Sequence, residues 1–187
     1  MVLHYGMVSF RSQVARKLLN YFFLNQGARA YTNQLARLLD VDPKNLDRKL
    51  KEFEREGLLQ SEFSGKQRYF SLNPRFPLLR EYRKVFLKTQ GIEARLKTVL
   101  NKLPGLKAAY LFGSYAKDNL DASSDLDLLL VGEHSPLAAQ KIVLPVQREI
   151  QREINIVDMT EKEFQLKKRT GNVFVKHIFS QPLVKLL

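Results

Sequence analysis

The sequence of 187 residues contains no cysteine and no tryptophan, and it has only three histidines. Without cysteine the chain can form neither a disulfide nor a thiolate metal site, and His4, His134 and His177 are too scattered to predict a histidine site. We expect each histidine to be a surface or half-buried side chain. No apolar run approaches the roughly 20 residues that cross a bilayer, and the first ten residues lack the pattern of a signal peptide. The sequence therefore predicts a cytoplasmic protein with no membrane partner.

Positive charge is abundant and unevenly distributed. The chain has 31 Lys and Arg against 19 Asp and Glu, a net charge of +12. Residues 1–103 hold 20 basic and 9 acidic residues, whereas residues 104–187 hold 11 and 10. A basic half-chain favours a polyanionic partner, because cations placed on phosphates release condensed counterions. Solubility alone is the other explanation. The apolar fraction of 44% suffices for one large or two small cores.

Three helices are predicted in the first half. Apolar residues at helical spacing predict a helix over 11–25, and Thr32 is expected to cap a short second helix. Asp42 followed by Pro43 is a typical opening for a third helix, over 43–56. One face of that helix is apolar and the other is basic. The apolar face consists of Leu46, Leu50 and Phe53.

A hairpin follows these helices. Residues 58–63 and 67–72 are strand candidates, and residues 64–66 form a turn with a basic residue at its tip. Helix, short helix, basic helix and hairpin is the order of a winged helix-turn-helix. Residues 11–73 resemble the winged-helix domains of prokaryotic transcription regulators. That resemblance implies binding to duplex DNA, with the third helix in a major groove and the hairpin, or wing, on the flanking backbone. The expected DNA contacts are Lys44, Asn45, Arg48 and Lys49 on the helix, and Lys66 and Arg68 on the wing.

Residues 77–103 have an apolar pattern of helical period, which is interrupted near Gly91. We expect two helices that link the halves of the chain. Their apolar surplus would suit either packing within one chain or the surface of a homodimer, which two-fold DNA sites favour. The expected domains are residues 1–75, a helical linker over 76–103, and residues 104–187.

The second half carries two short motifs. A strand candidate over 106–112 runs directly into Gly113 and Ser114, a turn that can offer N–H groups and a hydroxyl to phosphate. Asp125 and Asp127 open a second apolar strand. Because side chains alternate along a strand, both carboxylates lie on one face, where their repulsion favours a cation between them.

These motifs resemble the minimal nucleotidyltransferases of the DNA polymerase beta superfamily, over about residues 105–160. Phe-Gly-Ser ending at Ser114 and Ser-Asp-Leu-Asp ending at Asp127 match the pattern of that superfamily. The resemblance implies a mixed sheet flanked by helices, with Gly113 and Ser114 on a nucleoside triphosphate and Asp125 and Asp127 on Mg²⁺. The implied reaction transfers a nucleoside monophosphate to an acceptor hydroxyl.

The third carboxylate of the family is replaced in this chain. The residue that aligns with it is Asn155, which can ligate a cation through its oxygen but cannot act as a carboxylate base. Glu153 lies one pleat away on the same face as Asn155, and Asp158 lies on the opposite face. Either residue could replace the third carboxylate only if the register of this strand differs from the predicted one. Asp125, Asp127 and Asn155 are the catalytic candidates, and we expect nucleotide or metal binding to survive better than rapid catalysis.

The predicted fold class is α+β, with a winged helix, a helical linker and a nucleotidyltransferase-like domain. The whole arrangement resembles a group of largely archaeal transcriptional regulators that carry a nucleotidyltransferase domain. The leading hypothesis is a DNA-binding regulator with a weak nucleotidyltransferase site. The alternatives are an active enzyme that modifies a protein, RNA or small molecule, and an antitoxin-like partner of a second protein. Two short helices are expected to close the fold, with a core of Phe164, Leu166, Val173, Phe174, Ile178 and Phe179.

Overall fold

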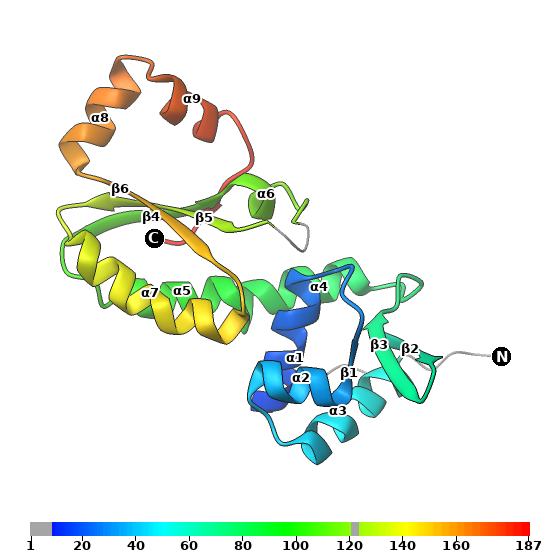
Figure 1. Ribbon diagram of the computed structural model, residues 1–187. Helices are drawn as coiled ribbons and strands as arrows, with labels where there is room; N and C mark the ends of the chain where they lie inside the picture. Colours follow the sequence, from blue (N-terminus) through cyan, green and yellow to red (C-terminus); the bar gives the residue numbers. More distant parts are fainter. Residues whose placement is uncertain (1–8, 121–123) are drawn as a thin grey trace. The chain divides into compact units, whose positions relative to one another are not determined.

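The computed structural model describes residues 9–120 and 124–187, so the prediction for His4 lies outside the described residues. The chain divides into two compact units, Met1–Gly91 and Ile92–Leu187. Both units combine helices with a small sheet, as Figure 1 shows.

The first unit contains three helices, a hairpin and a fourth helix. In chain order its elements are α1 (Gln13–Leu24), β1 (Ala30–Tyr31), α2 (Thr32–Leu39), α3 (Pro43–Arg55), β2 (Leu59–Ser64), β3 (Gln67–Leu72) and α4 (Leu79–Thr89). β3 lies between β1 and β2 in an antiparallel sheet. The turn between β2 and β3 contains Gly65 with φ +59°, a left-handed conformation that glycine adopts without a Cβ clash.

The two helix starts for which the sequence predicts a cap differ in outcome. The Asp42 carboxylate caps α3 by accepting the N–H of Asn45 at 2.9 Å, as predicted. The predicted cap at Thr32 is wrong: α2 begins at Thr32 itself, and Tyr31 precedes it without a side-chain cap. The reason is strand β1, which the sequence pattern did not reveal. It pairs with β3 and runs directly into the helix.

The predicted linker over 76–103 is divided between the two units. In α4 the buried Arg83 donates from Nε to the Phe23 carbonyl at 2.8 Å, and Phe86 packs on the Phe23 ring with centroids 5.6 Å apart. In the second unit, Arg95 of α5 (Ile92–Leu100) forms an ion pair with Glu149 at 2.8 Å. Each helix is therefore part of a core rather than of a separate linker.

The second unit is built on a four-stranded mixed sheet. Its further elements are β4 (Leu106–Phe112), α6 (Gly113–Ala116), β5 (Leu126–Gly132), α7 (Pro136–Ile150), β6 (Ile154–Met159), α8 (Glu161–Arg169), α9 (Val173–Phe179) and β7 (Val184–Lys185). The strand order is β6-β5-β4-β7, with β5 parallel to β6 and antiparallel to β4. This is the mixed sheet flanked by helices that the family resemblance implies.

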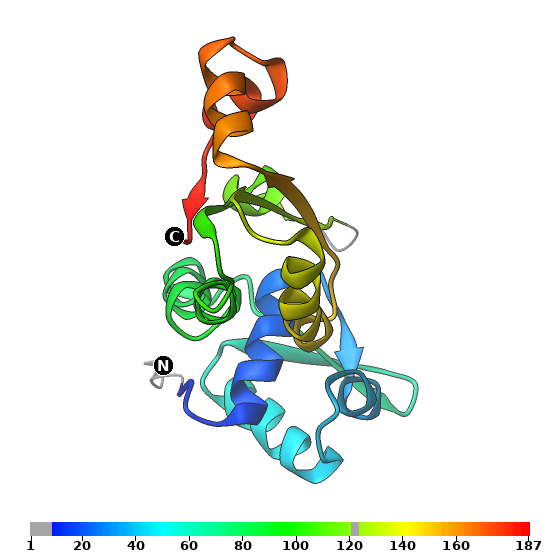
Figure 2. The same ribbon diagram turned by 90° about the vertical axis from the view of Figure 1, so that its left-hand side faces the viewer.

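The two faces of this sheet are covered differently. Figures 1 and 2 show α5 and α7 on one side of the sheet and α8 and α9 on the other. Leu129 and Val131 of β5 belong to the cluster that α8 and α9 complete. Because side chains alternate along a strand, the odd-numbered residues of β5 face α8 and α9, and the even-numbered ones face α5 and α7.

Within residues 9–120 and 124–187, no helix combines the length and the apolar character needed to span a membrane.

Candidate functional site

Three residues meet where β5 begins. Asp127 is the second residue of β5, and Asp125 immediately precedes the strand. In the sheet register Asp127 lies opposite Phe112 of β4 on one side and beside Asn155 of β6 on the other. Because side chains alternate along β5, Asp125 and Asp127 lie on the face of the sheet that α8 and α9 cover. Both carboxylates are half-buried.

Asn155 bridges the two carboxylates. Its Nδ2 donates to Asp125 Oδ2 at 3.3 Å, and its side chain also forms a hydrogen bond with Asp127. The structure thus brings the amide to the position where the resemblance implies a third acid. An amide N–H satisfies a lone pair of each carboxylate but adds no negative charge.

The turn after β4 touches the site through a glycine. Gly113 has φ +70°, and a Cβ built on it would overlap with Asp127 Oδ2. Only glycine therefore fits, because any side chain would collide with the carboxylate and strain the backbone. Ser114 follows in α6, and its carbonyl accepts the Asn119 N–H at 3.0 Å, which closes the turn. Gly113 thus packs directly against Asp127, and Ser114 is the next residue of the same turn.

The loop before Asp125 is held by residues that sequence reasoning missed. Arg152 is buried and donates from Nη1 to the Ser124 carbonyl, and the Leu126 N–H donates to the Glu153 carbonyl at 3.0 Å. These bonds join the start of β5 to the segment that enters β6. A single arginine before a strand carries no signal for this role, since its partner lies 28 residues away.

Asp158 and Glu153 do not join the site. Asp158 lies in register with Leu130 on the opposite face of the sheet, and its Oδ1 is 2.6 Å from His134 Nε2. The expectation of a surface or half-buried His134 is wrong, because its side chain is only 1% exposed beside that carboxylate. Glu153 precedes β6 and is exposed. His177 is exposed, as predicted.

The donor set of the site fits Mg²⁺. Two carboxylates are hard oxygen ligands, and Mg²⁺ commonly takes one or two carboxylates together with water and substrate phosphates. The Asn155 amide would add its oxygen only by turning its Nδ2 away from Asp125. Residues 9–120 and 124–187 contain no group of three or more His, Cys, Asp and Glu side chains arranged to hold a metal ion. A cation held by Asp125 and Asp127 would leave coordination positions open for water and phosphate oxygens.

The pKa of Asp127 is raised above its ordinary value. Burial is the main cause and the charge of Asp125 adds to it, whereas the hydrogen bond from Asn155 opposes both. A carboxyl with a raised pKa in the folded state binds protons more tightly there than in the unfolded chain. The contribution of Asp127 to the free energy of unfolding is therefore present below the ordinary pKa of aspartate and is lost as pH rises above it. A bound cation would restore this contribution by stabilising the ionised carboxylate.

We expect Asp127→Asn to raise the melting temperature at pH 7 in the absence of divalent cations. The variant removes a half-buried charge and keeps the shape that packs on Gly113. The gain should vanish below about pH 4, where wild-type aspartate is protonated in both states. Calorimetric melts over about pH 3 to 8 measure the melting temperatures of both proteins. Mg²⁺ should reduce the difference between the two melting temperatures, because it stabilises the wild type. An equal or lower melting temperature for the variant at pH 7 would contradict the raised pKa.

In the first unit the structure separates the predicted DNA contacts into two groups. Lys44, Asn45 and Arg48 are exposed on α3, and Lys66 is exposed on the hairpin. Two further predicted contacts are engaged within the unit. Lys49 Nζ lies 2.6 Å from Glu52, and Arg68 Nη2 lies 2.6 Å from Glu54.

Two further cations on α3 are not among the predicted DNA contacts, although the sequence pattern already places Lys51 on the basic side of the helix. Lys51 and Arg55 are exposed and continue the spacing of Lys44 and Arg48, so the four share one helix face. Lys51 forms an exposed ion pair with Asp47 at 2.7 Å, which costs little to break because water screens both groups. We call Lys44, Arg48, Lys51 and Arg55 the α3 basic face.

Comparison with known proteins bears on the second unit. Residues 94–179 match the family model described as polymerase beta, nucleotidyltransferase. This part of the chain has the nucleotidyltransferase fold. The match runs from α5 to the last residue of α9, so it includes Gly113, Ser114, the carboxylate pair and Asn155.

Two solved structures similar to this chain are toxin–antitoxin complexes. One is described as a toxin–antitoxin with AMP-PNP; it is 18% identical over 51% of this chain and 72% of the other, with a TM-score of 0.38. The other is described as a tri-AMPylated Shewanella oneidensis HEPN toxin in complex with MNT antitoxin; it is 17% identical over 51% and 68%, with a TM-score of 0.34. No curated protein gave a match to the sequence.

Proposed function

We propose that the second unit binds a nucleoside triphosphate with Mg²⁺ and transfers the nucleoside monophosphate only slowly. One observation carries the proposal: two carboxylates share a face beside a glycine turn, and the residue that bridges them is an amide. Asp125 and Asp127 would hold the cation, while Gly113 and Ser114 would contact the phosphates. When bound, Mg²⁺ supplies charge that orients and polarises phosphate oxygens.

The slow rate follows from proton transfer. In nucleotidyl transfer an acceptor hydroxyl attacks the α-phosphorus, pyrophosphate leaves and the hydroxyl proton must go to a base. Asn155 cannot take that proton, because an amide is not basic at neutral pH. Asp125 and Asp127 are committed to the cation. The chain's own residues therefore position the reactants without supplying a dedicated base.

The nucleotide site is tested by Asp125→Asn combined with Asp127→Asn. Wild-type protein should bind a nucleoside triphosphate in calorimetry with Mg²⁺ and much more weakly with EDTA, because phosphates complete the coordination of the cation. The double variant should lose the Mg²⁺-dependent part of the affinity. Glu133→Gln with Glu161→Gln is the matched control, since it removes two exposed carboxylates from the same unit. Metal-independent affinity that is equal in all three proteins would overturn the proposal.

We further propose that the first unit is a winged helix that binds duplex DNA, which would make the chain a transcription regulator. The α3 basic face supports this, since four exposed cations on one face of a helix match the phosphate lining of a major groove. The hairpin after α3 would be the wing, with Lys66 on the flanking backbone. Lys49 and Arg68 would contribute less, because their partners Glu52 and Glu54 must first release them.

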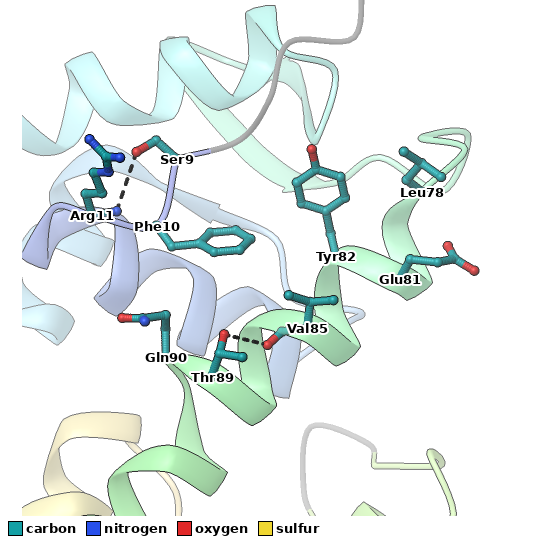
Figure 3. A pocket seen from close by; sticks show the side chains of 9 residues that line it. All are labelled: Ser9, Phe10, Arg11, Leu78, Glu81, Tyr82, Val85, Thr89 and Gln90. Atoms are coloured by element: carbon teal, nitrogen blue, oxygen red, sulfur yellow. Dashed lines mark hydrogen bonds between the residues drawn. The ribbon is translucent and has the colours of Figure 1, made fainter.

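The DNA-binding proposal includes a homodimer. A groove beside α4 has a volume of about 640 Å³. Figure 3 shows Phe10, Tyr82 and Val85 among the side chains that line it. Leu78 and Val85 are 48% and 54% exposed. Exposed apolar residues beside such a groove suit self-association, which two-fold DNA sites favour.

The second candidate function is modification or neutralisation of a partner protein, in the manner of an antitoxin. It is favoured by exposed apolar side chains on the helices α8 and α9. Leu166 and Val173 are 51% and 82% exposed, and basic Lys168 and Lys176 lie on the same helices. Such a surface fits a protein partner with acidic and apolar groups. Assembly of this kind is also what the descriptions of the two similar complexes name.

A further inference from the structure

The predicted core at the end of the chain is wrong for four of its six residues. Phe164 and Ile178 lie in the core, whereas Leu166, Val173, Phe174 and Phe179 are exposed by 51%, 82%, 41% and 37%. Phe179 still packs on Tyr110 with ring centroids 5.4 Å apart. Phe174 packs instead on Phe112, the last residue of β4.

Phe174 contacts the site through one intervening ring. Its ring meets the Phe112 ring edge-on, with centroids 6.3 Å apart and an interplanar angle of 88°. Phe112 lies opposite Asp127 in the antiparallel register, so the two side chains share one face with Cβ atoms about 5 Å apart. Asp127, Phe112 and Phe174 therefore follow one another across the sheet toward α9.

The two sides of Asp127 differ in chemistry. On the β6 side lies the polar Asn155, and on the β4 side lies Phe112, which runs directly into Gly113. A triphosphate held at the glycine turn would thus have an aromatic surface beside it on the β4 side. The β6 side would remain for the acceptor hydroxyl.

We propose that Phe174 is the platform on which the nucleobase stacks. This inference rests on the proposed nucleotide site. The ligand class is a nucleoside triphosphate with little selectivity for the base, because stacking on an aromatic ring tolerates every base. Phe112 holds the platform ring in place by its edge contact, and Phe174 presents its exposed surface to the ligand.

The test uses two ligands, Mg·ATP and Mg·tripolyphosphate, and the full chain. Phe174→Ala should weaken Mg·ATP binding roughly 5- to 150-fold and leave Mg·tripolyphosphate binding unchanged, since only ATP carries a base. Phe174→Tyr should restore the affinity. Leu166→Ala, an exposed apolar residue on α8, is the matched control and should bind both ligands as the wild type does.

The chain offers a spectroscopic readout as well. It contains no tryptophan, so Phe174→Trp would create its only indole. Mg·ATP should quench that fluorescence by stacking, and Mg·tripolyphosphate should not.

Four outcomes would overturn the inference or the nucleotide site on which it rests. If Phe174→Ala binds Mg·ATP with wild-type affinity, Phe174 is not a base platform. The same conclusion follows if a folded Phe174→Ala loses affinity for Mg·ATP and Mg·tripolyphosphate equally, and circular dichroism checks that the variant is folded. Wild-type protein that binds tripolyphosphate and ATP with equal affinity would exclude a contribution from the base while leaving the phosphate site intact. Wild-type protein that binds neither would overturn the proposed nucleotide site itself.

Discussion

Asn155→Asp is expected to turn a slow or silent nucleotidyltransferase into an active one. The new carboxylate would lie beside Asp125 and Asp127, because Asn155 Nδ2 is already 3.3 Å from Asp125 Oδ2 and β6 is in register with β5. It would add an anionic metal ligand and a proton acceptor, which together are worth a factor of roughly 10²–10⁴ in rate. The measurement is transfer of label from α-labelled nucleoside triphosphate to the protein itself or to added RNA.

The same substitution carries a cost that serves as an internal check. A third carboxylate replaces a hydrogen-bond donor between two acids, so the metal-free variant should melt at a lower temperature than the wild type. Mg²⁺ should recover the difference, because the cation neutralises the added charge.

Two controls separate the gain from indirect effects. Asn155→Ala removes the amide without adding charge and should transfer no faster than the wild type. Asp158→Asn changes a carboxylate on the opposite face, bonded to His134, and should not change transfer. Rapid wild-type transfer that Asn155→Asp leaves unchanged would mean that two carboxylates suffice, and the active-enzyme alternative would then be the better one.

Replacing Lys44 and Arg48 together by Ala is expected to weaken duplex DNA binding by more than about tenfold. Both side chains are exposed on the α3 basic face, and each DNA-binding cation of this kind is worth about 1–3 kcal/mol. The slope of log affinity against log salt should fall by about one for each phosphate that the variant no longer neutralises. Fluorescence anisotropy with a labelled duplex, over a range of salt concentrations, measures both quantities and the number of chains per duplex.

A matched control lies in the same unit. Lys84→Ala with Lys88→Ala removes two exposed charges from α4, away from α3. It should lower DNA affinity far less, and Lys49→Ala should also have a small effect because Glu52 already holds that ammonium group. If both double variants weaken binding equally, net charge rather than the α3 basic face would explain the affinity. Binding with no salt dependence would exclude the phosphate contacts altogether.

Much of the local structure could be predicted from the sequence, because it depends on residues close together in the chain. At the start of α3 the Asp42 side chain accepts a hydrogen bond from a free N–H of the first turn, and Pro43 has no N–H that would need a partner. Both effects are local and do not depend on the rest of the protein. The alternation of β5 likewise places Asp125 and Asp127 on one face without reference to any other strand. The position of Asn155 beside them followed from the family resemblance, and the parallel register of β5 and β6 agrees with it.

Other features depend on partners far away in the chain. The pairing of Arg68 with Glu54, of His134 with Asp158 and of Arg152 with Ser124 joins residues separated by 14, 24 and 28 positions. No spacing rule predicts such pairs, because a charged or imidazole side chain is compatible with both solvent and a partner until the fold places one beside it.

The helices of the first half, the hairpin, the carboxylate pair and the glycine turn can all be read from the amino-acid sequence, since they follow from short-range geometry and periodicity. Other features depend on how the elements pack. These are which charged side chains are free to bind a partner, where the two units divide and which apolar residues are exposed. Phe174 illustrates the reason. Its helical pattern resembles that of a core residue, but in the folded chain it lies in the first turn of α9, contacts Phe112 edge-on and remains 41% exposed.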